Sequence, residues 1–161
     1  MKNFPVIYGG KEYWISRAIA VVVKIVANDV YGNKYILAVQ RGKGTPDPEF
    51  VGAWCMPCGY LDFDETIKEA ARRETFEETG LKFAIEDFTL VNINDEPDSD
   101  KRQNVTFRFI VNSPIPIEGL NQILTNRYSE KDEVSNIKFI LISELDNYKW
   151  AFNHKKLIKE I

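Results

Sequence analysis

Residues 59–80 read GYLDFDETIKEAARRETFEETG and combine the pattern of a helix with carboxylates on its apolar side. At about 100° per residue, Ile67 and Ala71 share the face that a helix normally packs against a core. Glu74 and Glu78 fall on that same face, where an ordinary amphipathic helix carries Leu or Ile. Half-buried carboxylates either take up protons or gain a cation, and an all-oxygen cluster suits a hard ion such as Mg2+. The stretch therefore predicts a helix with a divalent-metal site on its inner face.

Both ends of this helix carry capping signals. Asp62 or Asp64 is expected to cap its start, where an acidic side chain also suits the positive end of the helix dipole. Gly80 is expected to end it, because glycine adopts positive φ without strain.

A second interpretation of the acidic run is a solvated helix face, which is where most charged residues lie. Glu65, Glu69 and Arg73 fit this interpretation. They stand four apart with the acids N-terminal to the base, the favourable order for ion pairs along a helix. Glu74 and Glu78 do not fit it, because they continue the apolar stripe and repel each other at i,i+4.

The spacing of these residues resembles the signature of the Nudix hydrolase superfamily. That signature is Gly, five residues, Glu, seven residues, Arg-Glu, an aliphatic residue, any residue, Glu-Glu, any residue, Gly and an aliphatic residue. The chain matches it at Gly59, Glu65, Arg73, Glu74, Glu77, Glu78, Gly80 and Leu81. Thr75 stands where an aliphatic residue is usual, and its hydroxyl can bond back to the helix. Cys58 replaces the first Gly of the Pro-Gly-Gly turn that precedes the signature in the family.

The resemblance implies a fold, a reaction and a cofactor. The expected fold is α+β, a Nudix-like α/β/α sandwich with a mixed β-sheet, formed by residues 1–161 as a single domain. The expected reaction is Mg2+-dependent hydrolysis of a phosphoanhydride bond in a nucleoside diphosphate derivative, with Mn2+ as an alternative ion. The expected substrates are nucleoside triphosphates, ADP-ribose, nucleotide sugars and dinucleotides. Relatives of this kind are often homodimers, so a homodimer is a further expectation.

The resemblance also assigns roles to the residues of the signature. Arg73 is expected to orient the glutamates through ion pairs, although a plain surface pair with Glu69 is an alternative. Glu65 either binds the metal or braces Arg73, and Gly59 is expected to let the backbone approach the metal site. The metal-binding positions carried over from the family are Glu74, Glu77 and Glu78, and Glu77 and Glu78 with Arg73 are also counted as catalytic.

Water attack needs a base or a water-orienting acid, which the family often draws from a loop outside the signature. Glu133 is the first candidate, because it precedes the last expected strand, and Glu130 is the second. A solvated loop acid is the alternative for both, since loops commonly carry charge.

Three residues are candidates for contact with the substrate. Arg41 ends a strand and opens a Gly-rich loop, so it is expected to clamp phosphate, with Arg17 as a lesser candidate. Trp54 is a candidate for stacking on a base, although an aromatic residue in this setting is more often part of the core. Lys43, Tyr60 and Phe107 are weaker candidates of the same two kinds.

Cys55 and Cys58 raise the question of a redox pair or half of a zinc site. There is no second cysteine pair, and His154 is the only histidine. Residues three apart in a strand point to opposite faces, so the two thiols are expected to lie apart and to be free in a reducing compartment.

Composition limits the remaining classes of function. The net charge of −3 argues against a general nucleic-acid or membrane-surface binder. The longest apolar run, 18–26, is interrupted by Lys24 and too short to span a membrane. We expect a cytoplasmic protein whose partner is a small nucleotide. Two other classes stay open: a non-catalytic nucleotide-sensing module of the same fold, and an isomerase of prenyl diphosphates.

The rest of the chain is expected to be rich in strands. Gly9-Gly10 predicts a hairpin, and the β-branched run 17–27 predicts a long strand. The other expected elements are strands at 34–40, 54–57, 105–112 and 137–142, an extended segment at 82–92, turns and loops at 28–33, 41–48 and 94–102, a loop with a short helical piece at 114–133, and a helix at 150–161.

Overall fold

The computed structural model describes residues 2–97 and 103–160. Its strands are β1 (Phe4–Tyr8), β2 (Lys11–Ile15), β3 (Ile19–Asn28), β4 (Lys34–Arg41), β5 (Trp54–Cys55), β6 (Cys58–Tyr60), β7 (Thr89–Asn94), β8 (Val105–Asn112) and β9 (Val134–Leu141). Its α-helices are α1 (Ile67–Thr79), α2 (Ile117–Leu120) and α3 (His154–Glu160), with 3-10 turns at Pro48–Phe50, Ile85–Asp87 and Ile142–Asn147. Across these described residues, we find no helix with the length and apolar character that crossing a membrane requires.

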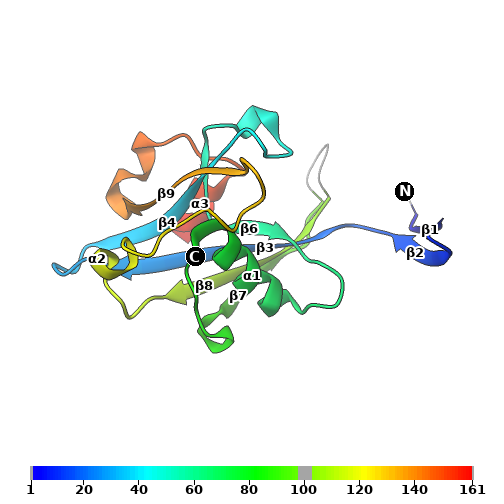
Figure 1. Cartoon of the computed structure of the whole chain (residues 1–161), viewed down its shortest axis with the longest axis horizontal. Helices are drawn as coiled ribbons and strands as arrows, with labels where there is room; N and C mark the ends of the chain where they lie inside the picture. The colour runs from blue at the N-terminus through cyan, green and yellow to red at the C-terminus, as the bar shows by residue number, and fades with distance from the viewer. Residues whose placement is uncertain (1, 98–102, 161) are drawn as a thin grey trace.

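The main sheet is mixed. Its strand order is β5-β4-β3-β8-β7, and β6 pairs with β3 while β9 pairs with β4 (Figure 1). The central pair β3–β8 is parallel over the whole length of β8, and the other pairs of this sheet are antiparallel. The expected mixed sheet is therefore confirmed.

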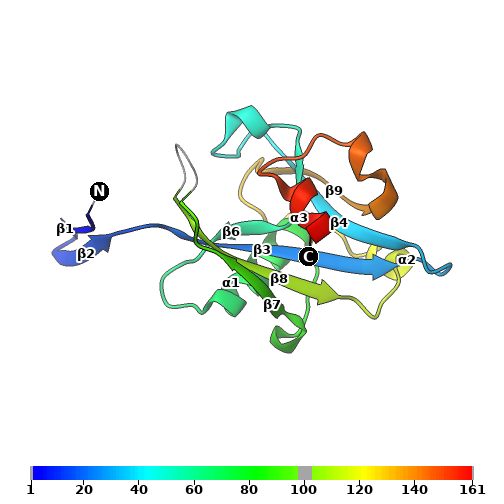
Figure 2. The ribbon, with the colours of Figure 1, turned by 180° about the vertical axis from the view of Figure 1, so that it is seen from behind.

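Strand β3 is buried on both faces, which explains its nearly continuous apolar sequence. Val21 lies in one core cluster with Ala71 of α1. Its neighbour Val22 points to the other face and lies in a second cluster with Leu157 of α3, as the alternation of a strand requires. Helices α1 and α3 thus cover opposite faces of the sheet, and the expected α/β/α sandwich is confirmed (Figures 1 and 2).

The charged residue inside β3 has a structural partner. Lys24 is buried, and its Nζ donates a 2.8 Å hydrogen bond to the carbonyl oxygen of Ile158 in α3. Burial lowers the pKa of this amine, and the nearby Lys34 lowers it further. The residue that interrupts the apolar run therefore ties the C-terminal helix to the central strand.

Helix α1 begins with a cap that differs from the one predicted from the sequence. Its N-cap is Thr66, whose hydroxyl accepts from the backbone N–H of Glu69 while the Glu69 carboxylate accepts from the N–H of Thr66. This capping box corrects the expected Asp62 or Asp64. Asp64 instead adopts a left-handed conformation (φ 66°) in the turn before the helix.

The end of α1 is as expected. Gly80 is in the left-handed conformation (φ 77°), and its N–H bonds to the carbonyl of Phe76. Thr75, the position that departs from the Nudix signature, is fully buried and its hydroxyl donates 2.8 Å to the Ala71 carbonyl. The expected bond back to the helix is confirmed.

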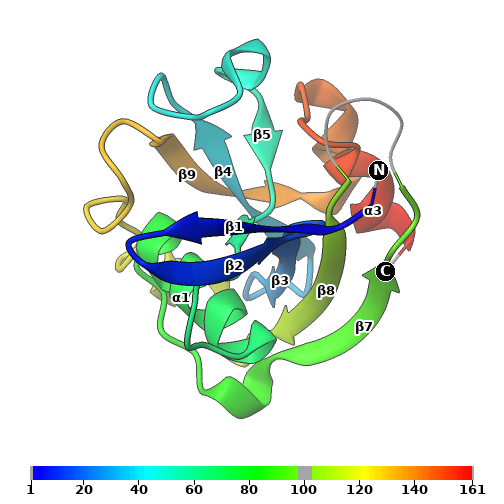
Figure 3. The ribbon, with the colours of Figure 1, turned by 90° about the vertical axis from the view of Figure 1, so that its right-hand side faces the viewer.

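The N-terminal hairpin forms a sheet of its own. β1 pairs with β2 in antiparallel register, and Gly9 and Gly10 both have positive φ, as the expected hairpin turn requires. The hairpin projects from one end of the molecule (Figure 1) and faces the viewer in Figure 3.

Some boundaries differ from those expected. β9 begins three residues earlier, and α3 begins at His154 because Phe152 and Asn153 adopt left-handed conformations that no helix continues through. Strand β5 ends at Cys55 instead of residue 57. The expected loop at 94–102 lies partly outside the described residues, and so does the last residue of the expected C-terminal helix.

Removal of the Thr66 hydroxyl is predicted to destabilise the fold. Thr66→Ala leaves the N–H of Glu69 without its capping acceptor, and we expect a loss of about 1 kcal/mol in the free energy of unfolding. This corresponds to a fall in Tm of roughly 2–4 °C, measured by calorimetry. Thr66→Ser keeps the acceptor and is the control. Equal Tm values for the Ala and Ser variants would show that the cap contributes nothing.

Candidate active site

Arg73 is the centre of the acidic cluster. Its Nε donates to Glu65, its Nη1 to Glu74 and Glu77, and its Nη2 to Glu65 and to the carbonyl of Tyr60. A guanidinium has five N–H groups, so the whole donor set of Arg73 is used. The bonds to the carboxylates measure 2.7–3.1 Å. This network holds the acids in fixed positions. It favours the expected orienting role of Arg73 over the alternative of a plain surface pair with Glu69.

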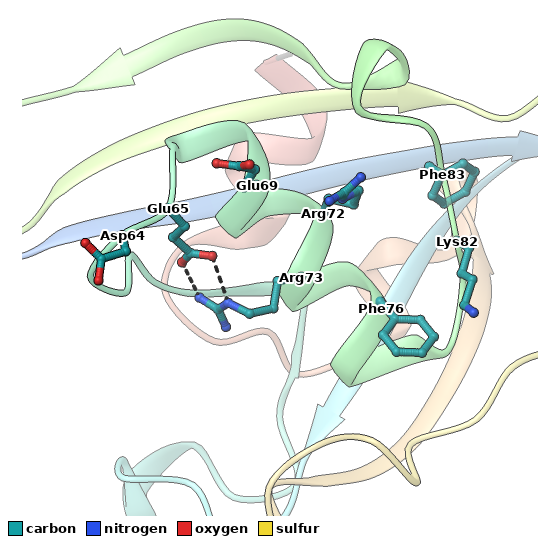
Figure 4. A pocket seen from close by; sticks show the side chains of 8 residues that line it. All are labelled: Asp64, Glu65, Glu69, Arg72, Arg73, Phe76, Lys82 and Phe83. Atoms are coloured by element: carbon teal, nitrogen blue, oxygen red, sulfur yellow. Dashed lines mark hydrogen bonds and ion pairs between the residues drawn. The ribbon is translucent and has the colours of Figure 1, made fainter.

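Glu65 lies just before α1 and is bound at both oxygens. Its Oε2 accepts from Arg73 Nε at 3.1 Å, and its Oε1 accepts from Arg73 Nη2 at 2.7 Å (Figure 4). The backbone N–H of Asp62 also donates to Oε1. The hydrogen bonds from Arg73 lower the pKa of Glu65. Of the two roles left open for Glu65, this geometry favours bracing Arg73.

Glu74 and Glu78 lie on the inner side of α1, as the helical wheel predicted. Glu78 is only 4% exposed, and its Oε2 accepts 3.1 Å from the backbone N–H of Cys58. Burial raises the pKa of Glu78 well above its usual value. Burial also raises the pKa of Glu74 to about 7, although Arg73 opposes this change through its hydrogen bond.

Gly59 sets the position of the Glu74 carboxylate. It lies in β6 opposite Val21 of β3, and its α-carbon faces the carboxyl group of Glu74. A Cβ at position 59 would overlap the carboxyl carbon and both of its oxygens. These atoms end a flexible side chain, so an alanine would displace Glu74 rather than break the sheet.

A loop outside the signature brings Glu133 to this cluster. Burial raises the pKa of Glu133, and Glu130 and Glu77 raise it further. Glu133 in turn contributes to the raised pKa of both Glu74 and Glu78, so the four carboxylates share one region of negative potential. This proximity agrees with the choice of Glu133 from the family resemblance and the order of elements along the chain; its role as the base stays a prediction.

Two glycines hold the Glu133 loop in place. Gly42 N–H donates 2.7 Å to the carbonyl of Glu133, and Gly44 N–H donates 2.8 Å to that of Asp132. A Cβ at Gly42 would overlap the Asp132 carbonyl, and one at Gly44 would overlap that of Lys131. The sequence indicated a glycine-rich loop here but not this contact. Its signal was the pair of glycines two residues apart, which lets two backbones come into contact.

Arg41 is buried and already paired. Its guanidinium makes a 3.2 Å ion pair with Asp47, bonds to the hydroxyl of Thr45, and lies 4.9 Å from the centre of the Phe152 ring. Its positive charge lowers the pKa of Glu133, so it lies near the acidic cluster. Its role in phosphate binding stays a prediction.

The other two substrate candidates also have partners within the protein. Arg17 donates to the carbonyls of Gln103, at 2.6 Å, and Asn104, at 3.0 Å, just before β8. Trp54 is 7% exposed and packs edge-on against Tyr148 in the core between the sheet and α3. This position supports the alternative of a core residue that the sequence left open for Trp54.

The expectation that Cys55 and Cys58 point apart is wrong. The two thiols and His154 offer ligand atoms that all lie within 4.8 Å of one another. The alternation of a strand does not apply, because β5 ends at Cys55 and the chain turns before β6 begins at Cys58. Both cysteines are free, and the hydrogen-bonding influence of the neighbouring Cys55 thiol, together with burial, raises the pKa of the Cys58 thiol.

A surface recess of about 490 Å³ lies beside α1 but does not contain the acidic cluster. Figure 4 shows its lining, which includes the basic residues Arg72 and Lys82 and the aromatic residues Phe76 and Phe83. Arg73 and Glu65 are shared between the lining of the recess and the acidic cluster. The lining of the recess does not include Glu74, Glu77 or Glu78, the three acids that the resemblance names as metal ligands.

The carboxylates of Glu74, Glu77 and Glu78 offer oxygen atoms of the kind that a divalent cation takes. Each uses one oxygen in the bonds described above and has a second oxygen that can serve as a ligand. Burial and neighbouring carboxylates raise the pKa of Glu74 and Glu78, so a cation would favour the charged form of both. Oxygen ligands alone are the set that Mg2+ and Mn2+ prefer.

Comparison with protein-family models matches residues 16–161 to the NUDIX domain. The chain belongs to the Nudix family. The resemblance drawn from the signature is thereby confirmed, and the match spans the sheet as well as the acidic helix.

This Nudix chain is similar to an ADP-ribose pyrophosphatase of Methanocaldococcus jannaschii, with 30% identity over 125 residues. The match covers 78% of this chain and 64% of the relative, so the chain spans somewhat less than two thirds of that protein's length.

Solved Nudix structures share the fold. The NUDIX domain of Shewanella oneidensis NrtR, complexed with ADP ribose, superposes with a TM-score of 0.69 at 20% identity, covering 91% of this chain and 86% of that one. A bifunctional NMN adenylyltransferase/ADP ribose pyrophosphatase of Francisella tularensis, complexed with AMP and a Mn ion, gives 0.67 at 24% identity, covering 90% of this chain and 41% of that one.

The raised pKa of Glu74 predicts a pH dependence of stability for this Nudix domain. Folding raises this pKa from 4.5 to about 7, so the folded chain binds the proton more tightly. The contribution of Glu74 is therefore fully present below about pH 4.5 and is lost as the pH rises through about 7. Glu74→Gln should gain stability relative to the wild type over this interval.

Urea unfolding in a metal-chelating buffer, at several pH values across this interval, measures the difference between the two proteins. Glu49→Gln, on the exposed turn Pro48–Phe50, is the control and should follow the wild type. Parallel curves for Glu74→Gln and the wild type would contradict the assignment.

Proposed function

We propose that this chain is a Nudix-type pyrophosphohydrolase that uses Mg2+ to cleave a phosphoanhydride bond in a nucleoside diphosphate derivative. The observation that carries the proposal is the group of acids on α1: Arg73 bonds to Glu74 and Glu77, and Glu78 accepts from the backbone N–H of Cys58, next to the Gly59 that makes room for Glu74. A buried group of acids has no structural use that an apolar residue would not serve better, and it costs stability.

The acids divide into ligands and supports. Glu74, Glu77 and Glu78 are proposed to hold the ion, with Mn2+ as the alternative to Mg2+. When bound, the ion lowers the pKa of a ligand water and screens the charge of the phosphate oxygens. Arg73 and Glu65 keep the ligand carboxylates in place, and Gly59 leaves room for the carboxylate of Glu74.

Glu133 is proposed to orient or deprotonate the attacking water. Its half-buried carboxylate lies in the potential of Glu77, and its raised pKa brings it closer to the pH at which a base is most effective. Water then attacks phosphorus, the proton passes to Glu133, and the bond between phosphorus and the bridging oxygen breaks. Two monophosphates leave when the substrate is a diphosphate that joins two groups.

ADP-ribose is the first substrate to test. The M. jannaschii relative is named an ADP-ribose pyrophosphatase, and the NrtR domain of the same fold was solved with ADP ribose. Cleavage of its pyrophosphate by water gives AMP and ribose 5-phosphate. A nucleoside triphosphate, a nucleotide sugar and a dinucleotide complete the panel.

A nucleotide-sensing module is the second candidate function, supported by the likeness to the NrtR domain. Turnover separates the two functions, because a sensor binds the nucleotide and returns it unchanged. The homodimer expected from the resemblance stays a prediction.

Loss of a ligand carboxylate is predicted to abolish hydrolysis. With Mg2+ and ADP-ribose, Glu77→Gln and Glu78→Gln should each lower kcat by at least about 100-fold, because stabilisation by a bound metal is worth several kcal/mol. Release of AMP, followed by chromatography, is the measurement. Glu69→Gln on the same helix is the control, since glutamine at this position preserves the capping box. Tight binding of ADP-ribose without any product would favour the sensor.

Glu133 and Glu130 are predicted to differ although they share one loop. Glu133→Gln should lower kcat by roughly 100-fold or more with little change in KM, because it removes the proton acceptor. Glu130→Gln should stay close to the wild type, since Glu130 affects the site only through its charge on Glu133. The pH profile of kcat should also lose its acidic limb in Glu133→Gln. The reverse order of the two variants would identify Glu130 as the base.

A further inference from the structure

Cys55, Cys58 and His154 form a second group of side chains with the chemistry of ligands. Their sulfur and nitrogen ligand atoms lie within 4.8 Å of one another, with Cys55 and His154 buried and Cys58 half-buried. We propose that these three residues bind one soft divalent metal ion of the zinc type. The proposal is independent of the hydrolase function, because it uses none of the acidic ligands.

The backbone brings the two thiols together. Cys55 ends β5, which pairs with β4 at Val39, and Cys58 begins β6, which pairs with β3 at Val22. Between them the carbonyl of Pro57 accepts 2.9 Å from the N–H of Val23, which fixes the turn. The spacing of two residues between cysteines is the one that structural zinc sites use for half of their ligands.

The third ligand comes from the start of α3. Left-handed conformations at Phe152 and Asn153 turn the chain so that His154 faces the cysteine turn. Its Nδ1 accepts 3.0 Å from the backbone N–H of Met56, the residue after Cys55. A lone pair of the imidazole is therefore already directed at this turn, and metal binding at Nδ1 exchanges this hydrogen bond for a coordinate bond.

The chemistry of the ligands selects the ion. Thiolates and imidazole suit Zn2+, whereas Mg2+ prefers oxygen. Binding releases two protons, one from each thiol, and the two thiolates cancel the charge of the ion while the imidazole stays neutral. The complex adds no net charge to a buried position, which keeps the cost of burial small. A water molecule can complete the coordination, as in zinc sites with three protein ligands.

The bound ion would lie next to the acidic cluster. Cys58 donates its backbone N–H to Glu78, and Gly59 follows it in the chain. The ion would tie α3 to the turn that positions these residues. We therefore expect Zn2+ to raise Tm as well as to occupy the site.

Thiol accessibility tests the proposal without any substitution, because the chain contains only two cysteines. The reduced, metal-stripped protein is treated with an alkylating reagent under denaturant-free conditions, in excess Mg2+, with and without one equivalent of Zn2+. We expect Zn2+ to slow alkylation of both cysteines. In a parallel experiment, Co2+ should produce the intense near-ultraviolet absorption of a thiolate–cobalt bond, which carboxylates do not give.

Three variants assign the ligands. Cys55→Ser and Cys58→Ser should each weaken Zn2+ binding by more than about 100-fold in competition with a chromogenic chelator, since even supporting residues of metal sites contribute 10–100-fold. His154→Asn retains an acceptor for the Met56 N–H but lacks the imidazole, so it separates ligation from packing. It should weaken Zn2+ binding while its Tm without metal stays near that of the wild type.

Two results would overturn the proposal. One is equal alkylation with and without Zn2+, together with no thiolate–cobalt absorption. The other is Zn2+ binding that survives both cysteine substitutions, which would place the ion on the acidic cluster. Both results can be obtained whether or not the protein hydrolyses ADP-ribose. Failure of the proposed hydrolase function would therefore not count against the zinc site.

Discussion

The donor set of Arg73 is the interaction on which the rest of the site depends. One guanidinium reaches Glu65, which precedes the helix, and Glu74 and Glu77 within it, and it also bonds to the carbonyl of Tyr60 in β6. The helix and the strand that flank the acids are thereby linked through one side chain. A lysine could not replace it, because an ammonium has three donors and no planar geometry.

The same site also depends on three glycines, whose lack of a side chain allows close contacts. Gly59 gives the Glu74 carboxylate room, and Gly42 and Gly44 let the loop of Glu133 lie against the loop that follows β4. Charged residues supply the chemistry, but glycines set the distances between them. One of these glycines, Gly59, is the first residue of the signature, six positions before its first acid.

The sequence predicted the features that depend on local periodicity. The wheel placed Glu74 and Glu78 on the inner face of α1, and the structure confirms that placement. The prediction from sequence failed where the backbone departs from regular strand geometry, because the turn between β5 and β6 brings Cys55 and Cys58 together. No periodicity reveals that contact, and His154 joins it from almost a hundred residues away. The N-cap at Thr66 was not predicted because Asp62 and Asp64, which lie nearby, are also residue types that favour an N-cap position.

The charges of the cluster explain why the proposed function needs a cation. Glu74, Glu77, Glu78 and Glu133 lie in one region, and Arg73 is the cation that directly bonds to two of them. A diphosphate is itself an anion, so this region repels it, and a divalent ion held by these acids would lessen that repulsion. Burial, and to a smaller extent the neighbouring carboxylates, raises the pKa of Glu74 and Glu78, and a bound proton or a bound cation relieves both penalties.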